Sequence, residues 1–514
     1  MPLSFNLIDE SWIPTIDGHE NQALHSLYEA LARAPDLREV AGESAMVTIA
    51  LYRLLLAVLY RVFEPRMITD WKAVWNLGHF DQDMLRNYFE RWRARFDLFD
   101  TDRPFFQVGD FPAAAPNPVS RLSPDLSGGN NPTLFDHTLD GTPNPMGFAA
   151  VARLLVANQA TVVGGGNSPT GYTSAAPLAK GMAVIVEGDN LFETLMLNLV
   201  PYESLRGILR EKTETDLPVW EADAPIEPGR ERYPLGISDY LTWQSRAIRL
   251  RVDDQAANDG AVLFIDYGQG VKLPDNFDND PMMAYTQDRK RGTLARRLRE
   301  NRDLWRDSGA LLRDAETEDR RETAPDVTHF VANLTADQVL ESTKRKRIAV
   351  IGQCSDRAKV FFWRHERLPL PLALLNDDEL MNQLNNGLLV ADQVGKLLRY
   401  ATKDLARALL RPEDPTNADP KQVAALADSF QAGTAFWAGL ELPFRRFMAD
   451  LPDRPEEEFK QWASSVISHV RETWNRVVTD LGGSARAFRA AATVERKFLG
   501  NLKKTEIEGG LRDE

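Results

Sequence analysis

Near the N-terminus, hydrophobic residues follow the 3.6-residue period of a helix in three segments. The three segments are residues 45–63, 68–77 and 81–96. Ahead of them, short apolar runs are punctuated by Pro14 and by the Asp17-Gly18 pair, which predicts a short pair of strands. The N-terminal part of the chain is therefore expected to combine a small sheet with helices.

The middle of the chain mixes helical and strand patterns. Helical spacing occurs in residues 148–157, 190–200, 288–306 and 335–340. Thr335 is the expected N-cap of the last helix, because a threonine hydroxyl accepts a hydrogen bond from the first helical turn. Apolar and β-branched runs predict strands at residues 183–186, 247–252, 261–266, 347–351 and 359–363. Together these patterns predict an α+β domain over residues 1–372.

After residue 372 the pattern is helical only. Four long amphipathic segments are separated by connections that contain proline or glycine, at residues 378–411, 421–449, 456–480 and 485–502. Such segments are typical of an up-and-down bundle. The predicted fold class is an α+β N-terminal domain followed by an all-α C-terminal four-helix bundle over residues 373–514. The first of these helices is expected to break near Asn385-Asn386-Gly387.

Composition narrows the classes of protein that fit. The 514 residues carry a net charge of −14, which argues against a non-specific nucleic-acid coat but not against a local basic groove. Cys354 is the single cysteine, so an internal disulfide and a multi-cysteine metal site are excluded. Arg53 and Arg61 interrupt the most apolar helix, which predicts a buried helix rather than a membrane span. Without a secretory signal pattern, a soluble cytoplasmic protein with no membrane association is expected.

The sequence contains no recognisable catalytic constellation. None of the seven histidines lies four residues from another, and no Gly-x-Ser-x-Gly motif occurs. Gly166 and Gly171 have the glycine spacing of a phosphate loop, but Tyr172 stands where that loop requires lysine. The chain is therefore expected to be no enzyme and to carry no metal or cofactor. The alternative is an enzyme whose pocket is formed by the irregular loops 101–142 and 164–171.

Two clusters of positive charge stand out on this acidic chain. The segment 288–306 has eight basic and three acidic residues and includes Arg289, Lys290 and Arg291. A solvated charged helix explains that segment equally well. The second cluster, which we name the basic row, consists of Lys396, Arg399, Lys403, Arg407 and Arg411. On a helix the basic row occupies one face and extends about 22 Å, a length that suits contacts to successive phosphates.

Several segments in combination resemble one protein family. They are Phe5-Asn-Leu-Ile-Asp-Glu-Ser-Trp-Ile-Pro14, Arg103-Pro-Phe-Phe-Gln-Val108, the run Gly164-Gly165-Gly166, and Phe361-Phe-Trp-Arg-His-Glu-Arg-Leu-Pro-Leu-Pro371. With the helix-only C-terminal quarter, they resemble the CasA family, the large subunit of the type I-E CRISPR surveillance complex, Cascade. The resemblance covers the whole chain and implies the same order of an α+β domain and a four-helix bundle.

The resemblance implies a non-catalytic subunit of a crRNA-guided antiviral complex. Such a subunit recognises the protospacer-adjacent motif (PAM) of double-stranded target DNA from the minor groove, initiates duplex opening and holds the displaced strand. It also helps to recruit a helicase-nuclease. The other implied partners are the crRNA 5′ handle and the backbone, handle-capping and small subunits of Cascade. A purely structural assembly subunit is a further alternative.

The resemblance also assigns residues to PAM recognition. Gly164, Gly165 and Gly166 match a glycine loop that approaches the PAM, where a backbone without Cβ atoms can come close to base edges. Lys272 matches a lysine that reads the floor of the groove. Phe135, in loop 101–142, matches an aromatic residue that anchors the subunit at the crRNA handle.

Two further assignments concern strand separation. The wedge that parts the first base pair matches residues 352–358, with Gln353, Arg357 and Ala358 as candidates. Arg357 stands where the family commonly has glutamine. The basic row and the run Arg289, Lys290 and Arg291 would hold the displaced strand. Some relatives bind a structural zinc through four cysteines, which this chain lacks.

Overall fold

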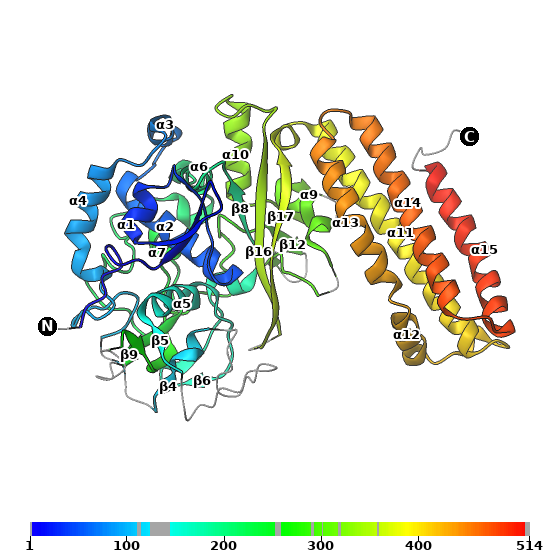
Figure 1. Cartoon of the computed structure of the whole chain (residues 1–514), viewed down its shortest axis with the longest axis horizontal. Coiled ribbons are helices and arrows are strands. Elements are labelled where there is room, and N and C mark those ends of the chain that lie inside the picture. The colour runs from blue at the N-terminus through cyan, green and yellow to red at the C-terminus, as the bar shows by residue number, and fades with distance from the viewer. Residues whose placement is uncertain are drawn as a thin grey trace. The chain divides into compact units, whose positions relative to one another are not determined.

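The computed structural model describes residues 3–109, 111, 115–123, 144–251, 259–288, 292–300, 302–316, 320–356 and 359–508. The backbone divides into two units (Figure 1). The first unit comprises Met1–Leu298, Ala310–Asn333 and Lys346–Arg367, and the second comprises Arg299–Gly309, Leu334–Arg345 and Leu368–Glu514. Two short segments from the middle of the chain therefore belong to the unit that contains the C-terminal helices.

A small sheet and several helices open the first unit. β1 (Ile13–Asp17) pairs antiparallel with β2 (Gln22–His25), which confirms the predicted strand pair, and also with β3 (Leu37–Val40). The helices that follow are α1 (Leu27–Ala32), α2 (Ala45–Phe63), α3 (Ile68–Leu77) and α4 (Gln82–Trp92). α2 and α3 have the predicted bounds, and a short 3-10 helix (Arg93–Phe96) completes the predicted segment 81–96.

α2 is a core helix of this unit. α5 (Phe148–Thr161), α6 (Leu191–Asn198) and α7 (Ile237–Leu241) pack against it. Among the described residues α2 is the one helix long and apolar enough to cross a membrane, but most of it is buried inside the structure. This burial explains why the helix is apolar on all sides.

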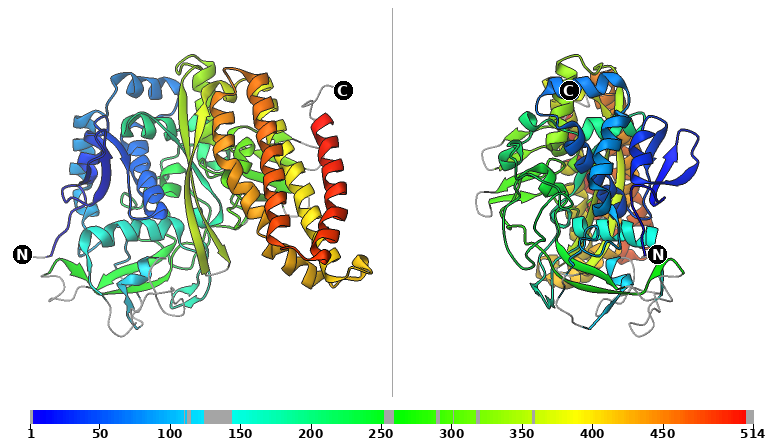
Figure 2. Two further views of the ribbon diagram at one scale, coloured as in Figure 1. Left: turned by 45° about the vertical axis from the view of Figure 1, so that its right-hand side comes forward. Right: turned by 90° about the vertical axis from the view of Figure 1, so that its left-hand side faces the viewer.

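Two sheets position the segments that matter for function. β8 (Ala183–Glu187), β16 (Arg345–Asp356) and β17 (Lys359–Pro371) form a sheet in the order β17-β16-β8, and the long β16 and β17 are visible in Figures 1 and 2. In the second sheet, β11 (Phe264–Gln269) lies between β4 (Asn117–Pro118) and β9 (Arg246–Arg251). β10 (Ala261–Val262) pairs with β5 (Met146–Gly147). The strands predicted in these regions are confirmed.

The helix predicted for residues 288–306 is wrong. β12 (Tyr285–Asp288) and β13 (Gly292–Ala295) pair antiparallel, in a sheet that also contains β14 (Ala315–Glu316) and β15 (Arg320–Thr323). The helical spacing of this segment does not define a buried face. Glu322 on β15 accepts hydrogen bonds from Arg296 at 2.7 Å and from Thr286 at 2.6 Å, so distant partners rather than local periodicity fix this structure. Arg289, Lys290 and Arg291 lie outside the described residues.

The helix predicted for residues 335–340 is also misplaced. α10 (Asp326–Ala336) begins after Pro325, whose carbonyl accepts backbone hydrogen bonds from Thr328 and His329. Thr335 therefore lies in the last turn of a helix and is not an N-cap. Proline directly before the first helical turn was the local signal for this start.

The second unit is dominated by helices. They are α11 (Asp378–Leu410), α12 (Pro420–Ser429), α13 (Ala432–Asp450), α14 (Pro455–Asp480) and α15 (Ala485–Glu508). α11 packs against each of the other four, and α13 packs against α14. The segment predicted as one helix at 421–449 is two helices, because Gln431 between them has a left-handed backbone with φ 52°.

The predicted break in α11 near Asn385-Asn386-Gly387 is wrong, because packing gives Gly387 another role. A Cβ atom on Gly387 would lie 2.7 Å from a ring carbon of Phe447, so only glycine allows this approach. The Trp462 indole donates a hydrogen bond to the Gly387 carbonyl at 2.9 Å. Phe447 and Trp462 stack with ring centroids 5.6 Å apart, which makes this contact part of the aromatic core.

Candidate nucleic-acid interface

The three glycines open a small hairpin at residues 164–174, which we name the glycine hairpin. It follows α5 and contains β6 (Asn167–Ser168) paired with β7 (Gly171–Tyr172). Gly165 and Gly166 have φ values of 136° and 91°, a conformation that side chains disfavour. The Thr173 hydroxyl donates to the Gly165 carbonyl at 2.7 Å, and the Thr173 N–H donates to the Gly166 carbonyl at 3.0 Å. The glycine run is thus required by the backbone geometry.

A substitution at Gly165 tests this requirement. Gly165→Val is expected to lower the free energy of unfolding by about 1–3 kcal/mol, because a branched side chain strains the backbone at this φ. Urea unfolding followed by circular dichroism measures the change. Gly18→Val is the matched control, since its Cβ atom would have no heavy atom within 4 Å. Equal loss in both variants would show that the backbone of Gly165 is not special.

Gln269, at the end of β11, anchors the glycine hairpin. Its side-chain oxygen accepts a hydrogen bond from the Ser174 N–H at 2.6 Å. The backbone N–H of Gln269 donates a hydrogen bond to the Ser168 hydroxyl at 2.9 Å, and its backbone carbonyl accepts one from the Thr170 hydroxyl at 2.7 Å. The Gln269 side chain is fully buried, so these contacts fix the hairpin on the end of the sheet.

Lys272 follows three residues after this anchor. Its N–H donates to the Arg230 carbonyl at 2.8 Å, and its carbonyl accepts from the Arg232 N–H at 3.2 Å. The side chain is half-buried, and within the described part of the chain its ammonium group makes no hydrogen bond or ion pair. The backbone is therefore fixed while the charge stays available for a ligand.

Gln353 lies on β16 and is buried. Its amide donates a hydrogen bond to the Thr161 carbonyl at 2.5 Å, at the end of α5 and three residues before Gly164. The other two wedge candidates, Arg357 and Ala358, lie outside the described residues, as does Phe135. The structure thus brings Gln353, the glycine hairpin and the Lys272 segment into one hydrogen-bonded region of the first unit.

Arg246 is a second anchor that the sequence analysis missed. Its guanidinium donates to the Ser174 carbonyl and to the Val163 carbonyl, both at 2.9 Å, and the side chain is buried. It thereby ties both ends of the glycine hairpin to β9. An arginine directly before the predicted strand 247–252 and a glutamine between two glycines were weak signals for these roles.

Four members of the basic row lie on α11 in the second unit, and their surroundings differ. Arg411 directly follows the end of the helix and has a non-helical backbone, with φ −135° and ψ 79°. Lys396, Arg399 and Arg411 are exposed, whereas Lys403 is half-buried. Within the described residues these four make no ion pair. Arg407 instead pairs with Asp404 at 2.7 Å, and Asp404 also accepts from Lys497 on α15 at 3.1 Å. The row therefore offers four unpaired charges and one that is largely neutralised.

The sequence analysis also missed an aromatic residue within the basic row. Tyr400 is 57% exposed, and the Arg399 guanidinium lies over its ring at 5.5 Å. Exposed aromatic rings beside cationic side chains are the usual platform for unstacked bases.

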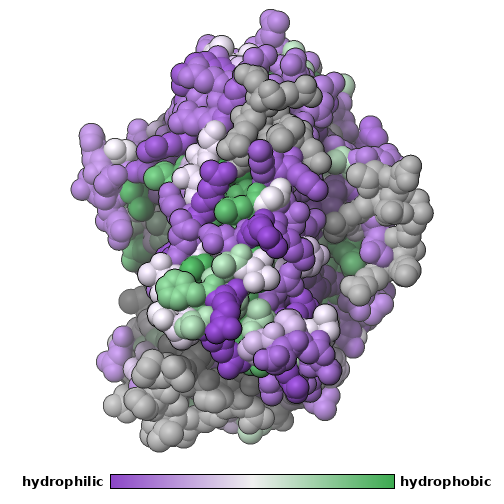
Figure 3. All heavy atoms as spheres, turned by 90° about the vertical axis from the view of Figure 1, so that its right-hand side faces the viewer, coloured by the Kyte–Doolittle hydropathy of each residue, from purple (hydrophilic) through white to green (hydrophobic). Residues whose placement is uncertain are grey.

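Figure 3 shows the face that carries α15, which is mostly hydrophilic with small separate hydrophobic patches.

The described residues contain no group of three or more His, Cys, Asp or Glu side chains that could hold a metal ion.

The family model for the CRISPR-associated protein Cse1 matches residues 6–481, and the chain belongs to that family. This result confirms the family resemblance found in the sequence.

This chain is similar to other proteins over nearly its whole length and theirs. The CasA/Cse1 protein of Thermus thermophilus is 36% identical over 97% of this chain and 98% of its own length. The crystal structure of Thermobifida fusca Cse1 is 26% identical, has a TM-score of 0.84 and shares 98% of each chain. A chain from a structure described as a CRISPR RNA-guided surveillance complex shares the fold at 20% identity, with a TM-score of 0.77 over 97% of this chain and 100% of its own.

Proposed function

We propose that this chain is the non-catalytic large subunit of a cytoplasmic crRNA-guided surveillance complex and recognises the PAM of target DNA. The observation that carries the proposal is the full-length similarity to the Thermus thermophilus CasA/Cse1 protein. The fold shared with a chain of a surveillance complex supports the same role. In this proposal residues 1–372 form the PAM-reading domain. Within residues 373–514 the four long helices α11, α13, α14 and α15 form the four-helix bundle, and the short α12 is an addition to it. Phe135 anchors the subunit at the crRNA handle.

The glycine hairpin and Lys272 are proposed to read the PAM from the minor groove. Gly166 is exposed, and a Cβ atom there would meet no heavy atom within 4 Å, so its backbone is open to an approaching groove. A·T and T·A pairs present the same acceptors in the minor groove. We therefore expect several related PAM sequences to be accepted, and a screen of randomised flanking bases measures this. A single permitted sequence would contradict minor-groove recognition.

Arg357 is proposed as the wedge residue. Gln353 serves as a positioning residue because its amide is buried and bonded to Thr161, close to the glycine hairpin. Opening duplex DNA costs about 1.4 kcal/mol per base-pair step, and pairing with the guide RNA returns nearly as much. The obstacle therefore lies in the first steps, and a side chain inserted at the PAM lowers their cost.

The basic row is proposed to hold the displaced strand. Lys396, Arg399 and Lys403 lie on one face of α11, and Arg411 follows directly after the helix. Tyr400 adds a surface for stacking. Arg289, Lys290 and Arg291 are proposed to assist. A helicase-nuclease and the other Cascade subunits complete the set of proposed partners.

The test of this function is duplex-DNA capture by the crRNA-loaded complex, assembled with and without this chain. Capture that depends on flanking bases only when the chain is present is the expected result. Unchanged capture without the chain would contradict the proposal. Reduced assembly with Gly165→Val or Arg357→Ala, while the complex that still forms keeps its PAM choice, would instead favour a purely structural subunit. Nucleotide hydrolysis by the intact chain would contradict a non-catalytic role.

A further inference from the structure

A cavity of about 140 Å³ lies in the first unit, next to the segment that carries Lys272. Leu217, Val219, Ile226 and Val271 are among the apolar residues that line it. A cavity of roughly 150 Å³ in another protein interior holds a benzene molecule, so this one has room for a single aromatic ring. The cavity is thus too small for a whole nucleotide but large enough for the ring of one.

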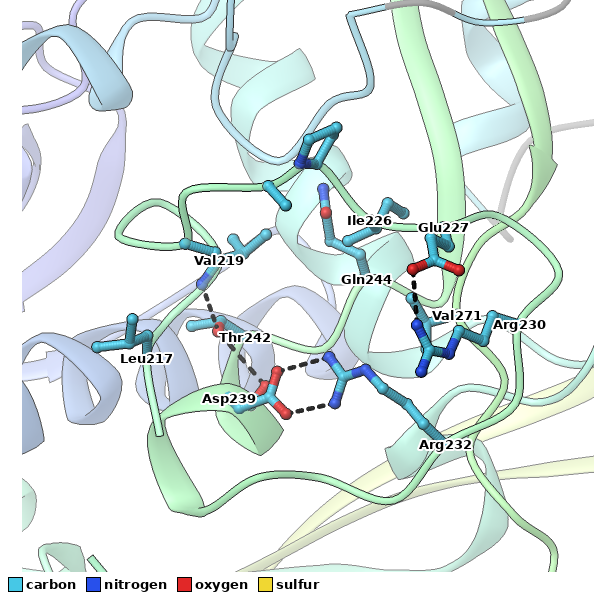
Figure 4. A pocket seen from close by; sticks show the side chains of 13 residues that line it. Leu217, Val219, Ile226, Glu227, Arg230, Arg232, Asp239, Thr242, Gln244 and Val271 are labelled. Atoms are coloured by element: carbon cyan, nitrogen blue, oxygen red, sulfur yellow. Dashed lines mark hydrogen bonds and ion pairs between the residues drawn. The ribbon is translucent and has the colours of Figure 1, made fainter. Parts of the chain in front are cut away.

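Gln244 gives the cavity a hydrogen-bonding group. Its side chain extends between Val219 and Ile226 (Figure 4). The residue is 4% exposed, and its amide nitrogen Nε2 has no hydrogen-bond partner in the structure. A buried amide without a partner destabilises a fold, which is a reason to look for a ligand that completes it.

The charged residues around the cavity neutralise one another. Arg232 donates to both carboxylate oxygens of Asp239, at 2.5 and 2.9 Å. Arg230 donates to Glu227 at 2.6 Å, and both of these side chains are exposed. Because each cation already has an anion, the cavity favours a neutral ligand over a phosphate or a carboxylate.

We propose that this cavity holds one unpaired nucleobase, whose edge hydrogen-bonds the Gln244 amide. A nucleobase is a flat neutral ring with hydrogen-bond donors and acceptors along its edge, which an amide group matches with its own donor and acceptor. The base stands in apolar contact with Val219, Ile226 and Val271, while its sugar and phosphate stay outside. The proposal rests on the proposed function, in which Lys272 contacts the PAM duplex beside the point where the two strands part.

The backbone links the cavity to that lysine. Arg230 and Arg232, which line the cavity, exchange backbone hydrogen bonds with Lys272. Val271, the residue before Lys272, donates its N–H to the Gln244 carbonyl at 2.8 Å. We therefore expect a strand contacted by Lys272 to come within reach of the cavity. The base comes from the displaced DNA strand or from the crRNA, and its chemistry is the same in either case.

The experiment is a scan with abasic sites in the assembled complex. Single abasic sites are placed along the displaced strand in one arm and along the crRNA 5′ handle in the other. Capture is compared between the wild type, Gln244→Met, which removes the amide at similar volume, and Ala224→Trp, which fills the cavity from an exposed position. Ala23→Trp, on the exposed part of β2, is the matched control.

We expect one position at which base removal weakens capture about tenfold in the wild type and in Ala23→Trp, but not in the two cavity variants. The arm that contains this position identifies the strand. Gln244→Met should leave the melting temperature unchanged or raise it, because it removes an unpartnered polar group. If capture requires the chain but no position separates the variants, the nucleobase proposal is wrong. If capture does not require the chain, the proposed function itself is wrong.

Discussion

Replacing Lys396, Arg399 and Lys403 together by glutamate is expected to reduce strand separation by the assembled complex about 100-fold. Initial capture of PAM-containing duplex should change much less, because the residues proposed to read the PAM belong to the first unit. The three side chains make no ion pair in the described residues, so their charge is available to phosphates. Reversal turns three attractive contacts into repulsive ones.

Fluorescence of 2-aminopurine in the displaced strand measures strand separation, and a gel-shift assay measures capture. For single-stranded nucleic acid, each lost phosphate contact reduces the log–log salt slope by about 0.7, so the triple variant should reduce it by about 2. The salt series therefore tests whether the loss comes from phosphate contacts rather than from a damaged fold.

A second triple variant with the same charge change controls for the net charge of the chain. Lys460, Arg471 and Arg476 are exposed on α14, away from the basic row in sequence. Their replacement by glutamate should reduce strand separation less than threefold, because long-range repulsion between exposed charges is screened by salt. Equal losses in the two triple variants, or an equal loss of capture and opening in the first, would contradict the proposed role of the basic row.

Local sequence signals were sufficient where a helix depends on its own caps and burial. α2 illustrates this, because the Ser44 side chain caps its first turn and nearly every residue that follows is apolar and buried. The basic row was also visible, because its spacing matches the helical period. The ion pair between Arg407 and Asp404 could be predicted from sequence, because the two residues are three positions apart on one helix. The second cation that contacts Asp404, Lys497, comes from α15 and could not be predicted.

Distant contacts explain what the sequence could not predict. Gln269 lies 95 residues from Ser174, and nothing in either neighbourhood announces the hydrogen bond that anchors the glycine hairpin. Gly387 has the appearance of a helix breaker, yet its lack of a side chain accommodates Phe447 from another helix. In both cases the residue type was noticed or noticeable, but its role depended on a partner that only the folded chain supplies.

A strong effect on stability is expected at a buried ion pair in the first unit. The Arg53 guanidinium donates to Asp280 at 2.7 Å, and both side chains are 1% exposed. Tyr240 donates its hydroxyl to the same carboxylate at 2.8 Å, and the Arg53 guanidinium lies over the Tyr240 ring at 4.9 Å. Burial alone would lower the pKa of Arg53, but Asp280 and Tyr240 outweigh it and raise that pKa.

Asp280→Ala is therefore expected to lower the free energy of unfolding by about 3–5 kcal/mol, because it leaves the Arg53 charge buried without its anion. Urea unfolding monitored by tryptophan fluorescence measures the change. Asp275→Ala is the control: its partner Lys180 lies at 3.3 Å, but Asp275 is fully exposed and its loss should have little effect. The double variant Arg53→Met with Asp280→Leu should recover much of the stability, since it removes both charges and restores volume. If Asp280→Ala changes stability no more than Asp275→Ala, water must reach Arg53, and the pair is not part of a dry core.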